Sequence, residues 1–279
     1  YCKNISLVLY PDGSVSVADD GRGIPFDDHP EEKRSAVEVV LTTLHSGGKF
    51  DHKTYNISGG LHGVGISVTN ALSEWLDIEV KRYGSFYKQR YEYGIPKTPI
   101  IETGNSESTG TKIRFFPNKS IFSQTEFHFD TLATRLRELA FLNKGLRIHI
   151  SDERDGKREE FYYEGGILSF VEYLNKNKTS LHEPIFFEKE LNDVHVWLAL
   201  QYNDSYREQV YSFVNNINTI EGGTHLTGFF TALTRVINSY IKKHKIGNGL
   251  SLQGEDVKEG LTSVISVKVR DPQFEGQTK

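Results

Sequence analysis

The chain has 279 residues, a net charge of −4 and 37% hydrophobic residues, a composition typical of a soluble globular protein. Its single cysteine, Cys2, excludes a disulfide scaffold and a cysteine-based zinc site, and no apolar run reaches the roughly 18 residues of a membrane-spanning helix. The charge also excludes a chain that is drawn to nucleic acid by its bulk charge alone, although a local basic patch stays possible.

The sequence contains no methionine and begins with Tyr1. Average usage would give about six methionines in a chain of this length, and a translated reading frame starts with one. We therefore expect this chain to be a piece of a longer protein.

The first third of the chain predicts a hairpin, a helix and a functional loop. Two β-rich runs, 5–10 and 14–18, flank the turn signal Pro11-Asp12-Gly13. Ser35 followed by Glu38 forms a capping box, which predicts a helix over 35–45. Residues 46–65 hold six glycines without periodicity, so we expect a functional loop there, and a helix over 65–72.

The remaining elements fall on either side of a change in character near Gly165-Gly166. Before it we expect strands at 75–82, 86–93 and 111–116, an amphipathic helix over 126–142, and a hairpin of 146–151 and 159–163 around Asp155-Gly156. After it we expect a helix over 167–174, a polar loop over 175–184, strands at 194–201 and 209–214, a helix from about 222 to 243, and a strand at 262–269.

The glycine-rich stretch Gly59-Gly60-Leu61-His62-Gly63-Val64-Gly65 precedes a predicted helix. Backbone N–H groups in such a stretch can approach an anion closely, and phosphate is the natural candidate. The stretch lacks the lysine of a P-loop and reverses the glycine order of a dinucleotide fold, and the catalytic loop of protein kinases is absent. A flexible surface loop is the alternative interpretation.

Two further signals lie at strand ends. Asp19, followed by Gly21 and Gly23, places a carboxylate where it can accept from an exocyclic amine such as that of adenine, with glycine allowing a flat ring to approach the backbone. Gly110-Thr111 opens the strand at 111–116. Each signal alone is also compatible with an ordinary turn.

Together the three signals resemble the GHKL ATPase family, which includes type II topoisomerases, a heat-shock chaperone, MutL and sensor histidine kinases. The segments most similar to the ATPase subunits of type II topoisomerases lie at 19–25, 29–32, 44–50, 58–65, 163–166, 221–225 and 277–279. The resemblance therefore spans essentially the whole chain. The resemblance implies an α+β architecture. A GHKL (Bergerat) α/β sandwich ATPase domain would cover 1–166, and a smaller α/β transducer domain with a ribosomal-protein-like βαβ fold would cover 167–279.

The resemblance also implies the residues of an ATP site. Asp19 would bind the adenine amine with the help of Thr111 and a water, and the base would be lined by Gly23, Ile24 and Pro25. The phosphates would be covered by Lys49 and Tyr55 and wrapped by Gly60, Leu61, His62, Gly63, Val64 and Gly65. The mouth and floor of the pocket, where aminocoumarin-type inhibitors compete with ATP, would be formed by Arg22, Arg82, Val17 and Ile113. In the transducer domain, Lys279 would reach the γ-phosphate and Gln277 would orient water, as catalytic residues.

The match breaks at the start of the chain. In the family the general base is a glutamate and the Mg²⁺ ligand an asparagine one helical turn later, on a helix that precedes the segment where Tyr1 lies. Asn4 is not that asparagine, because it leads straight into a strand and has no glutamate four residues earlier. We therefore expect ATP and Mg²⁺ as cofactors of the parent protein, no metal ligand in this chain, and no ATP hydrolysis by the chain alone.

The resemblance extends to partners and location. It implies a cytoplasmic protein without a membrane partner, homodimerisation of the ATPase region, a heterotetramer with the DNA-cleaving protein of the enzyme, and contact with DNA. A basic lining for DNA could come from Arg135, Arg137, Lys242, Lys243 and Lys245, with ordinary helix solvation as the alternative. The motifs leave open which of the two bacterial type II enzymes this is, and a MutL-like ATPase or a non-catalytic nucleotide-sensing or dimerisation module also stay open.

Overall fold

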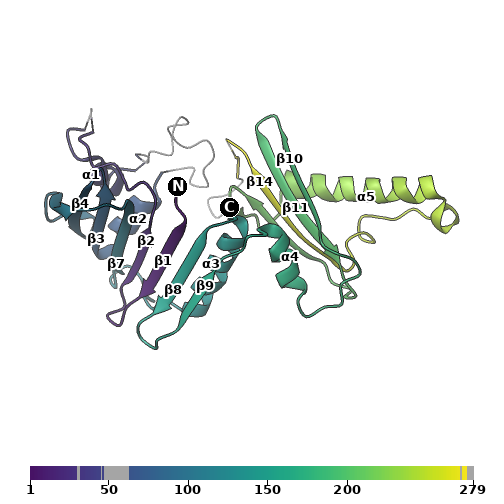
Figure 1. Ribbon diagram of the computed structural model, residues 1–279, viewed down its shortest axis with the longest axis horizontal. Helices are drawn as coiled ribbons and strands as arrows, with labels where there is room; N and C mark the ends of the chain where they lie inside the picture. The colour runs from purple at the N-terminus through teal and green to yellow at the C-terminus, as the bar shows by residue number, and fades with distance from the viewer. Residues whose placement is uncertain (30–31, 45, 47–62, 271, 275–279) are drawn as a thin grey trace. The chain divides into compact units, whose positions relative to one another are not determined.

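The computed structural model describes residues 1–29, 32–44, 46, 63–270 and 272–274. These residues form two compact units, which divide between Glu164 and Gly165 (Figure 1). In the part of the chain that is described, no helix combines the length and the hydrophobicity of a membrane span.

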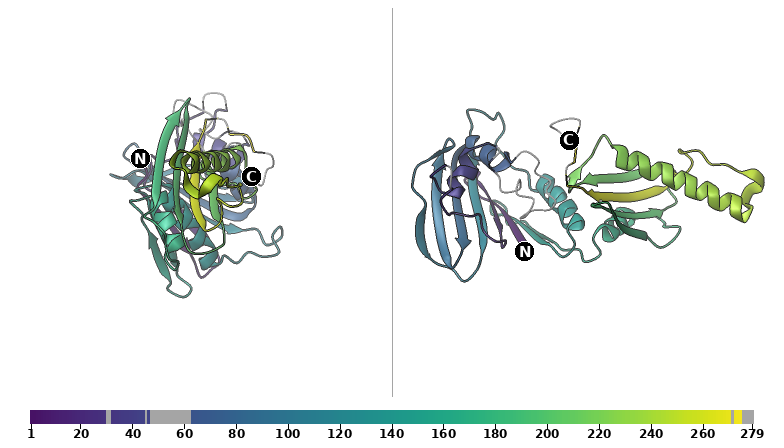
Figure 2. Two further views of the ribbon diagram at one scale, coloured as in Figure 1. Left: turned by 90° about the vertical axis from the view of Figure 1, so that its right-hand side faces the viewer. Right: turned by 90° about the horizontal axis from the view of Figure 1, so that it is seen from above.

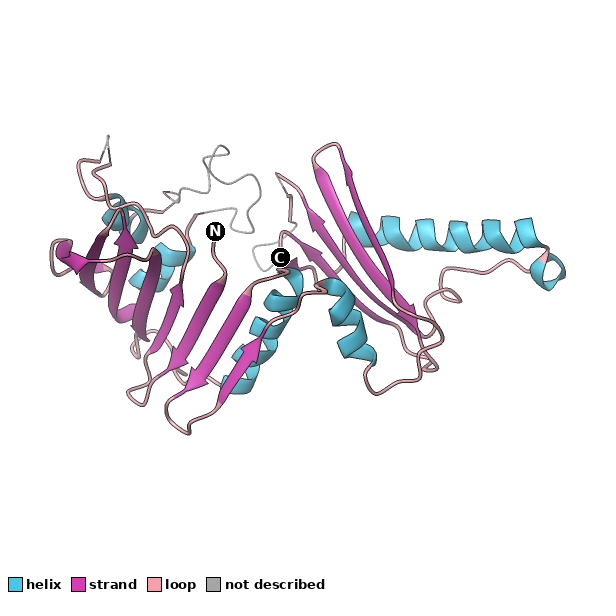
Figure 3. Cartoon of the chain, in the orientation of Figure 1, coloured by secondary structure: helices cyan, strands magenta, loops and turns pink. Residues whose placement is uncertain are grey.

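The first unit contains, among its described residues, a mixed nine-stranded sheet with the order β5-β4-β3-β7-β2-β1-β8-β9, in which β6 pairs with β4. Figure 3 shows the strands in magenta and the helices in cyan. All pairs are antiparallel except β1 with β8. Its elements are β1 (Asn4–Leu9), β2 (Val15–Asp19), α1 (Ala36–Thr42), α2 (Gly65–Ala71), β3 (Ser73–Arg82), β4 (Ser85–Glu92), β5 (Ile95–Pro96), β6 (Ile101–Asn105), β7 (Gly110–Pro117), α3 (Phe129–Leu142), β8 (Arg147–Asp152) and β9 (Arg158–Phe161).

The local signals of the sequence account for several of these elements. Asp12 accepts hydrogen bonds from the backbone N–H and hydroxyl of Ser14, which closes the β1–β2 turn. Ser35 caps α1, because its hydroxyl oxygen accepts from the backbone N–H of Glu38 at 3.2 Å. The predicted hairpins and the helices at α1, α2 and α3 are thereby confirmed, with α3 beginning at Phe129 instead of residue 126.

Helices cover one face of this sheet. One core cluster joins Phe129 and Ala133 of α3 to side chains such as Leu9 and Ile150 on the strands. A second joins Val37 and Leu41 of α1 to Leu76, Ile78, Val80 and Tyr91 of β3 and β4. Strand residues two apart share a face, and the strand register places both clusters on the same side of the sheet.

The second unit is a five-stranded sheet, in the described residues, with the order β10-β11-β14-β12-β13 and one parallel pair, β12 with β14. Its elements are α4 (Ile167–Asn175), β10 (Ile185–Leu191), β11 (Val194–Tyr202), β12 (Gln209–Val214), β13 (Ile217–Asn218), α5 (Thr224–His244), a 3₁₀ turn η2 (Ile246–Gly249) and β14 (Leu261–Lys268); Figure 2 gives two further views.

The two helices of the second unit lie on opposite faces of its sheet. Phe229 of α5 packs with Leu200, Ile265 and Val267. Ala199 and Val264 point to the opposite face of the same strands and are fully buried. The helix α4 contacts these strands, β11 and β14. Alternation along the strands therefore assigns one face to each helix.

Four strands were not predicted: β5, β6, β10 and β13. The longest is β10, an edge strand whose seven residues are all exposed. A strand without a buried face lacks the alternation of apolar and polar residues from which strands are predicted. Its pairing with β11, and not its own side chains, defines it.

Candidate functional site

Asp19 ends strand β2 on the helix-covered face of the first sheet. Its carboxylate oxygen Oδ1 accepts a hydrogen bond from the backbone N–H of Gly21 at 2.8 Å. Burial raises the pKa of the Asp19 carboxyl, and the backbone N–H groups of Gly21 and Thr111 offset part of that rise. The result is a partly desolvated acceptor that a hydrogen-bond donor on a ligand would stabilise in its charged form.

The sheet beneath Asp19 is apolar and partly open. Val15, Val17 and Asp19 share one face of β2, and Val15 belongs to the core under α3. Val17 is nevertheless 39% exposed. It pairs with Ile113 of β7, which packs against the core under α1. Val17 and Ile113 thus form a partly exposed apolar strip between two helix-covered clusters, which can contact a flat hydrophobic ring.

Thr111 joins the strand to the loop that follows Asp19. It pairs with Asp19 across β2 and β7, is 8% exposed, and its hydroxyl oxygen accepts from the backbone N–H of Ile24 at 3.2 Å. Ile24 packs against the core under α1, whereas Pro25 is exposed. The structure thus brings together Asp19, Thr111, Gly23 and Ile24, four of the residues that the resemblance assigns to the adenine.

Glycine is required at two positions of this loop and its neighbour strand. Gly23 has φ +74°, and a Cβ there would lie 2.5 Å from the carbonyl oxygen of Lys81. Gly110 has φ +150°, and a Cβ there would lie 2.1 Å from the carbonyl oxygen of Asp19. Contacts this short are excluded for real Cβ atoms, so the loop can lie against the ends of β3 and β7 only because both residues lack a side chain.

Arg82 holds the same loop from β3. Its Nη1 donates to the carbonyl oxygens of Gly23 at 2.8 Å and of Arg22 at 3.2 Å, and its Nη2 donates to the hydroxyl of Tyr83. Arg22 itself is exposed and lies 4.0 Å above the ring of Tyr1. The prediction placed both arginines at the mouth of the pocket. The structure shows Arg82 bound to the backbone of the loop and Arg22 at its surface.

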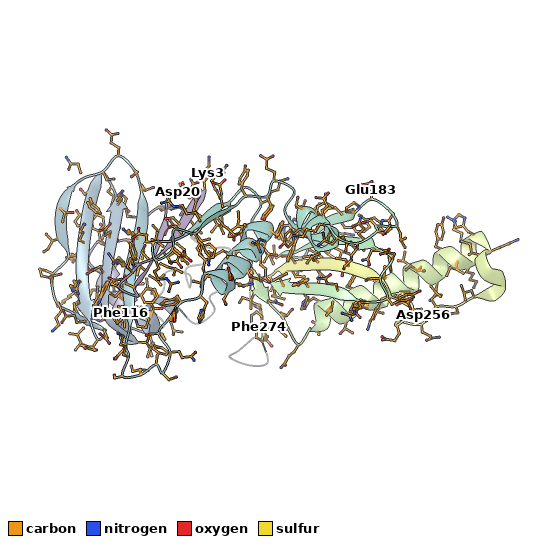
Figure 4. All side chains as sticks on the ribbon, turned by 90° about the horizontal axis from the view of Figure 1, so that it is seen from below. Lys3, Asp20, Phe116, Glu183, Asp256 and Phe274 are labelled. Atoms are coloured by element: carbon orange, nitrogen blue, oxygen red, sulfur yellow. The ribbon has the colours of Figure 1, made fainter. Side chains whose placement is uncertain are left out.

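Asp20 has a different role from its neighbour Asp19. Its carboxylate accepts from the backbone N–H groups of Lys3 and Asn4, at 2.7 and 2.9 Å, and from the Asn4 amide at 2.7 Å. Asp20 and Lys3 lie close together in Figure 4. Partial burial opposes ionisation, but the hydrogen bonds from Asn4 and Lys3 outweigh it and hold the pKa of Asp20 far below its ordinary value. Sequence reasoning missed this contact, because it joins residues 16 and 17 positions apart.

The phosphate-binding side of the predicted site is described only in part. Gly63, with φ +57°, and Val64 lead into α2, which begins at Gly65. The other predicted residues of this side lie outside the described residues: Lys49, Tyr55, Gly60, Leu61, His62, Gln277 and Lys279.

The basic residues proposed to line a DNA path differ in their surroundings. Arg135 pairs with Glu138 at 2.7 Å and Arg137 with Glu159 at 2.9 Å, both on the first unit. Lys242 and Lys243 are exposed in the last turn of α5, and Lys245 is its left-handed C-cap. The lysines are therefore the more accessible cations.

A polar cavity of about 660 Å³ lies within the second unit. Its buried amides are already paired: Asn175 donates to Gln201 at 2.8 Å, and Gln201 donates to the carbonyl oxygen of His182 at 2.7 Å. These bonds join α4 to the sheet, so the cavity is a less suitable ligand site than the strip beside Asp19.

Comparison with known proteins assigns each of the two units to a protein family. The family described as "Histidine kinase-, DNA gyrase B-, and HSP90-like ATPase" matches residues 1–121, and the family "DNA gyrase B" matches residues 166–279. The fold is therefore that of an ATPase of the gyrase B and HSP90 type, followed by a second domain.

Individual relatives narrow this class. The DNA gyrase B protein of Clostridium acetobutylicum is 55% identical over 283 residues, and that of Thermotoga maritima is 53% identical over 288 residues; each match covers the whole chain but 44% and 45% of the relative. The crystal structure of the 43K ATPase domain of Thermus thermophilus gyrase B with an aminocoumarin superimposes with a TM-score of 0.83 at 37% identity, covering 99% of this chain and 72% of that one. The chain belongs to the DNA gyrase B family.

Two further findings concern the length of the relatives and a solved structure of a topoisomerase IV domain. The chain spans less than half the length of the curated relatives. The topoisomerase IV ATP-binding domain of Francisella tularensis, in complex with a small-molecule inhibitor, superimposes with a TM-score of 0.81 at 36% identity, covering all of this chain and 75% of that one.

Proposed function

We propose that this chain is the ATP-binding part of the B protein of a DNA gyrase, a type II topoisomerase that couples ATP binding and hydrolysis to DNA strand passage and negative supercoiling. One observation supports this most directly. A half-buried carboxylate, Asp19, ends the strand beside the partly exposed apolar strip of Val17 and Ile113 on the helix-covered face of the sheet.

The adenine end of the site is built from described residues. The Asp19 carboxylate accepts from the exocyclic amine, and Val17 and Ile113 contact the ring. Thr111 and Arg82 hold the loop at Gly23 and Ile24 against the base. Binding of an amine to a partly desolvated carboxylate favours its ionised form.

The phosphate end rests on the family resemblance and on Gly63–Gly65. In the proposed function the glycine-rich stretch binds the triphosphate through backbone N–H groups, Lys49 and Tyr55 cover it, Lys279 contacts the γ-phosphate, and Gln277 orients water. Mg²⁺ accompanies ATP in this chemistry. The described residues contain no group of three or more His, Cys, Asp or Glu side chains that could hold a metal ion.

We assign residues 1–166 to an ATP-binding domain and 167–279 to a transducer domain. The partners of the whole protein would be DNA, a second copy of the ATPase region and the gyrase A protein in a heterotetramer. Aminocoumarins would compete at the adenine end, because the Thermus thermophilus relative was solved with one. An enzyme acting on chromosomal DNA would work in the cytoplasm.

The corresponding ATPase protein of topoisomerase IV is the second candidate, since its ATP-binding domain superimposes almost as well. Reconstitution of the full-length protein with its DNA-cleaving partner distinguishes the two. ATP-dependent negative supercoiling of relaxed plasmid supports gyrase. Decatenation and relaxation without supercoiling support topoisomerase IV. The absence of any ATP-dependent change of DNA topology contradicts both.

A further inference from the structure

Asn70 is a buried polar residue in α2, and its exposed fraction is 1%. Its amide nitrogen Nδ2 donates to two backbone carbonyl oxygens from distant parts of the first unit. One is that of Leu41, at 3.0 Å, and the other is that of Gly94, at 3.2 Å.

These two bonds connect three elements. Leu41 lies in the last turn of α1, and its backbone is 29 residues from Asn70 in the sequence. Gly94 lies in the turn between β4 and β5, with φ +79°. A Cβ on Gly94 would lie 3.1 Å from the Cα of Ala71, so this turn packs directly on the end of α2.

Stability alone does not explain an asparagine at this place. Its acceptor oxygen Oδ1 is buried and has no hydrogen-bond partner within the described part of the chain. A buried acceptor without a partner lowers stability. What asparagine provides here is the pair of donated bonds.

The bonds hold the last turn of α2, one residue before the helix ends at Ala71. The helix begins at Gly65, directly after Gly63 and Val64, and the hydroxyl of Ser67 closes its first turn by donating to the carbonyl oxygen of Val64 at 3.0 Å. Because α2 has only seven residues, a contact at Asn70 also determines where Gly63–Gly65 lie relative to α1.

We propose that Asn70 is a positioning residue for the phosphate side of the nucleotide site. By joining α2 to Leu41 and Gly94, it places Gly63–Gly65 for the phosphates and leaves the adenine end at Asp19 unaffected. This inference rests on the proposed function.

The test measures the affinity of the purified protein for two ligands, the non-hydrolysable ATP analogue AMPPNP and adenosine, by calorimetry. Loss of two hydrogen bonds should weaken AMPPNP binding about tenfold in Asn70→Ala, while adenosine affinity stays within about twofold of wild type. Asn70→Leu keeps the approximate volume but removes the donors, and should give the same result. Retained adenosine binding shows that each variant is folded.

Asn175→Ala is the matched control, because Asn175 is also buried and donates to a distant partner, but in the second unit. It should keep the wild-type ratio of the two affinities. Equal weakening of both ligands in the Asn70 variants, or no weakening of either, overturns the inference while the proposed function stands. A wild-type protein that binds neither ligand overturns both.

Discussion

Arg82 Nη1 donates a hydrogen bond to the carbonyl oxygen of Gly23, at 2.8 Å, and so ties the end of β3 to the loop that follows β2. The bond is charge-assisted, and the side chain is only partly exposed. In the proposed site, the loop at Gly23 lines the adenine. Arg82 therefore affects ligand binding through the position of the loop as well as by any direct contact.

Replacement of Arg82 by alanine should weaken adenosine binding. Loss of charge-assisted hydrogen bonds to the Gly23 and Arg22 carbonyl oxygens is expected to reduce affinity by about one order of magnitude. Arg82→Lys should recover part of it, since a lysine can reach one oxygen only. Arg90→Ala is the control, because Arg90 pairs with Asp77 on the opposite face of the sheet. Equal losses in the two alanine variants would contradict the role of Arg82.

Substitution of the two neighbouring aspartates should distinguish an effect on nucleotide affinity from an effect on protein stability. Asp19→Asn replaces the charged acceptor of the adenine amine with a neutral amide and should weaken the binding of AMPPNP and adenosine together, by about tenfold or more. It should leave the free energy of unfolding unchanged or slightly higher, because burial disfavours the charge of Asp19. Asp20→Asn should lower stability with little effect on affinity. Calorimetry and chemical denaturation test both variants, and unchanged nucleotide affinity in Asp19→Asn would refute the adenine assignment.

Asp20 also predicts a dependence of stability on pH. Its pKa in the folded protein lies below the ordinary value, so the folded state favours the carboxylate. The stabilisation is fully present above the unfolded pKa of about 3.9 and is lost as the pH falls toward the folded pKa. The difference in stability between wild type and Asp20→Asn, measured by urea denaturation, should therefore shrink below about pH 4. A difference that stays constant from neutral pH down to about pH 3 would show that Asp20 does not titrate in this way.

Gly110→Ala should disrupt the first unit more than its backbone angle alone predicts. The new Cβ would meet the carbonyl oxygen of Asp19 at 2.1 Å, and we expect a loss of about 2–4 kcal/mol in the free energy of unfolding. Gly84→Ala is the matched control: its φ is +84°, but no heavy atom lies within 4 Å of the new Cβ. The control should cost about 1 kcal/mol. Similar losses at both positions would show that the close approach at Gly110 is unimportant.

Local sequence signals predicted most elements of both units. The Ser35 cap, the turn at Asp12 and Gly13, and the amphipathic pattern of α3 each depend on residues close in the chain, and the structure shows all three. Strand β10 could not be predicted in this way, because its definition comes from pairing with β11. The same limit applies to β6, which pairs with β4 and has no buried residue.

The candidate site likewise combines residues that the sequence predicts with contacts that only the structure shows. Asp19, Gly23 and Thr111 could be named from the sequence, because residue type and strand position indicate a carboxylate, a tight turn and a strand entry. Only the tertiary structure decided what holds them. The bonds of Arg82 to Gly23, of Asp20 to Lys3 and of Asn70 to Leu41 join residues 59, 17 and 29 positions apart. Such contacts follow from the order of strands and the packing of helices, since no periodicity within a segment encodes a partner in another.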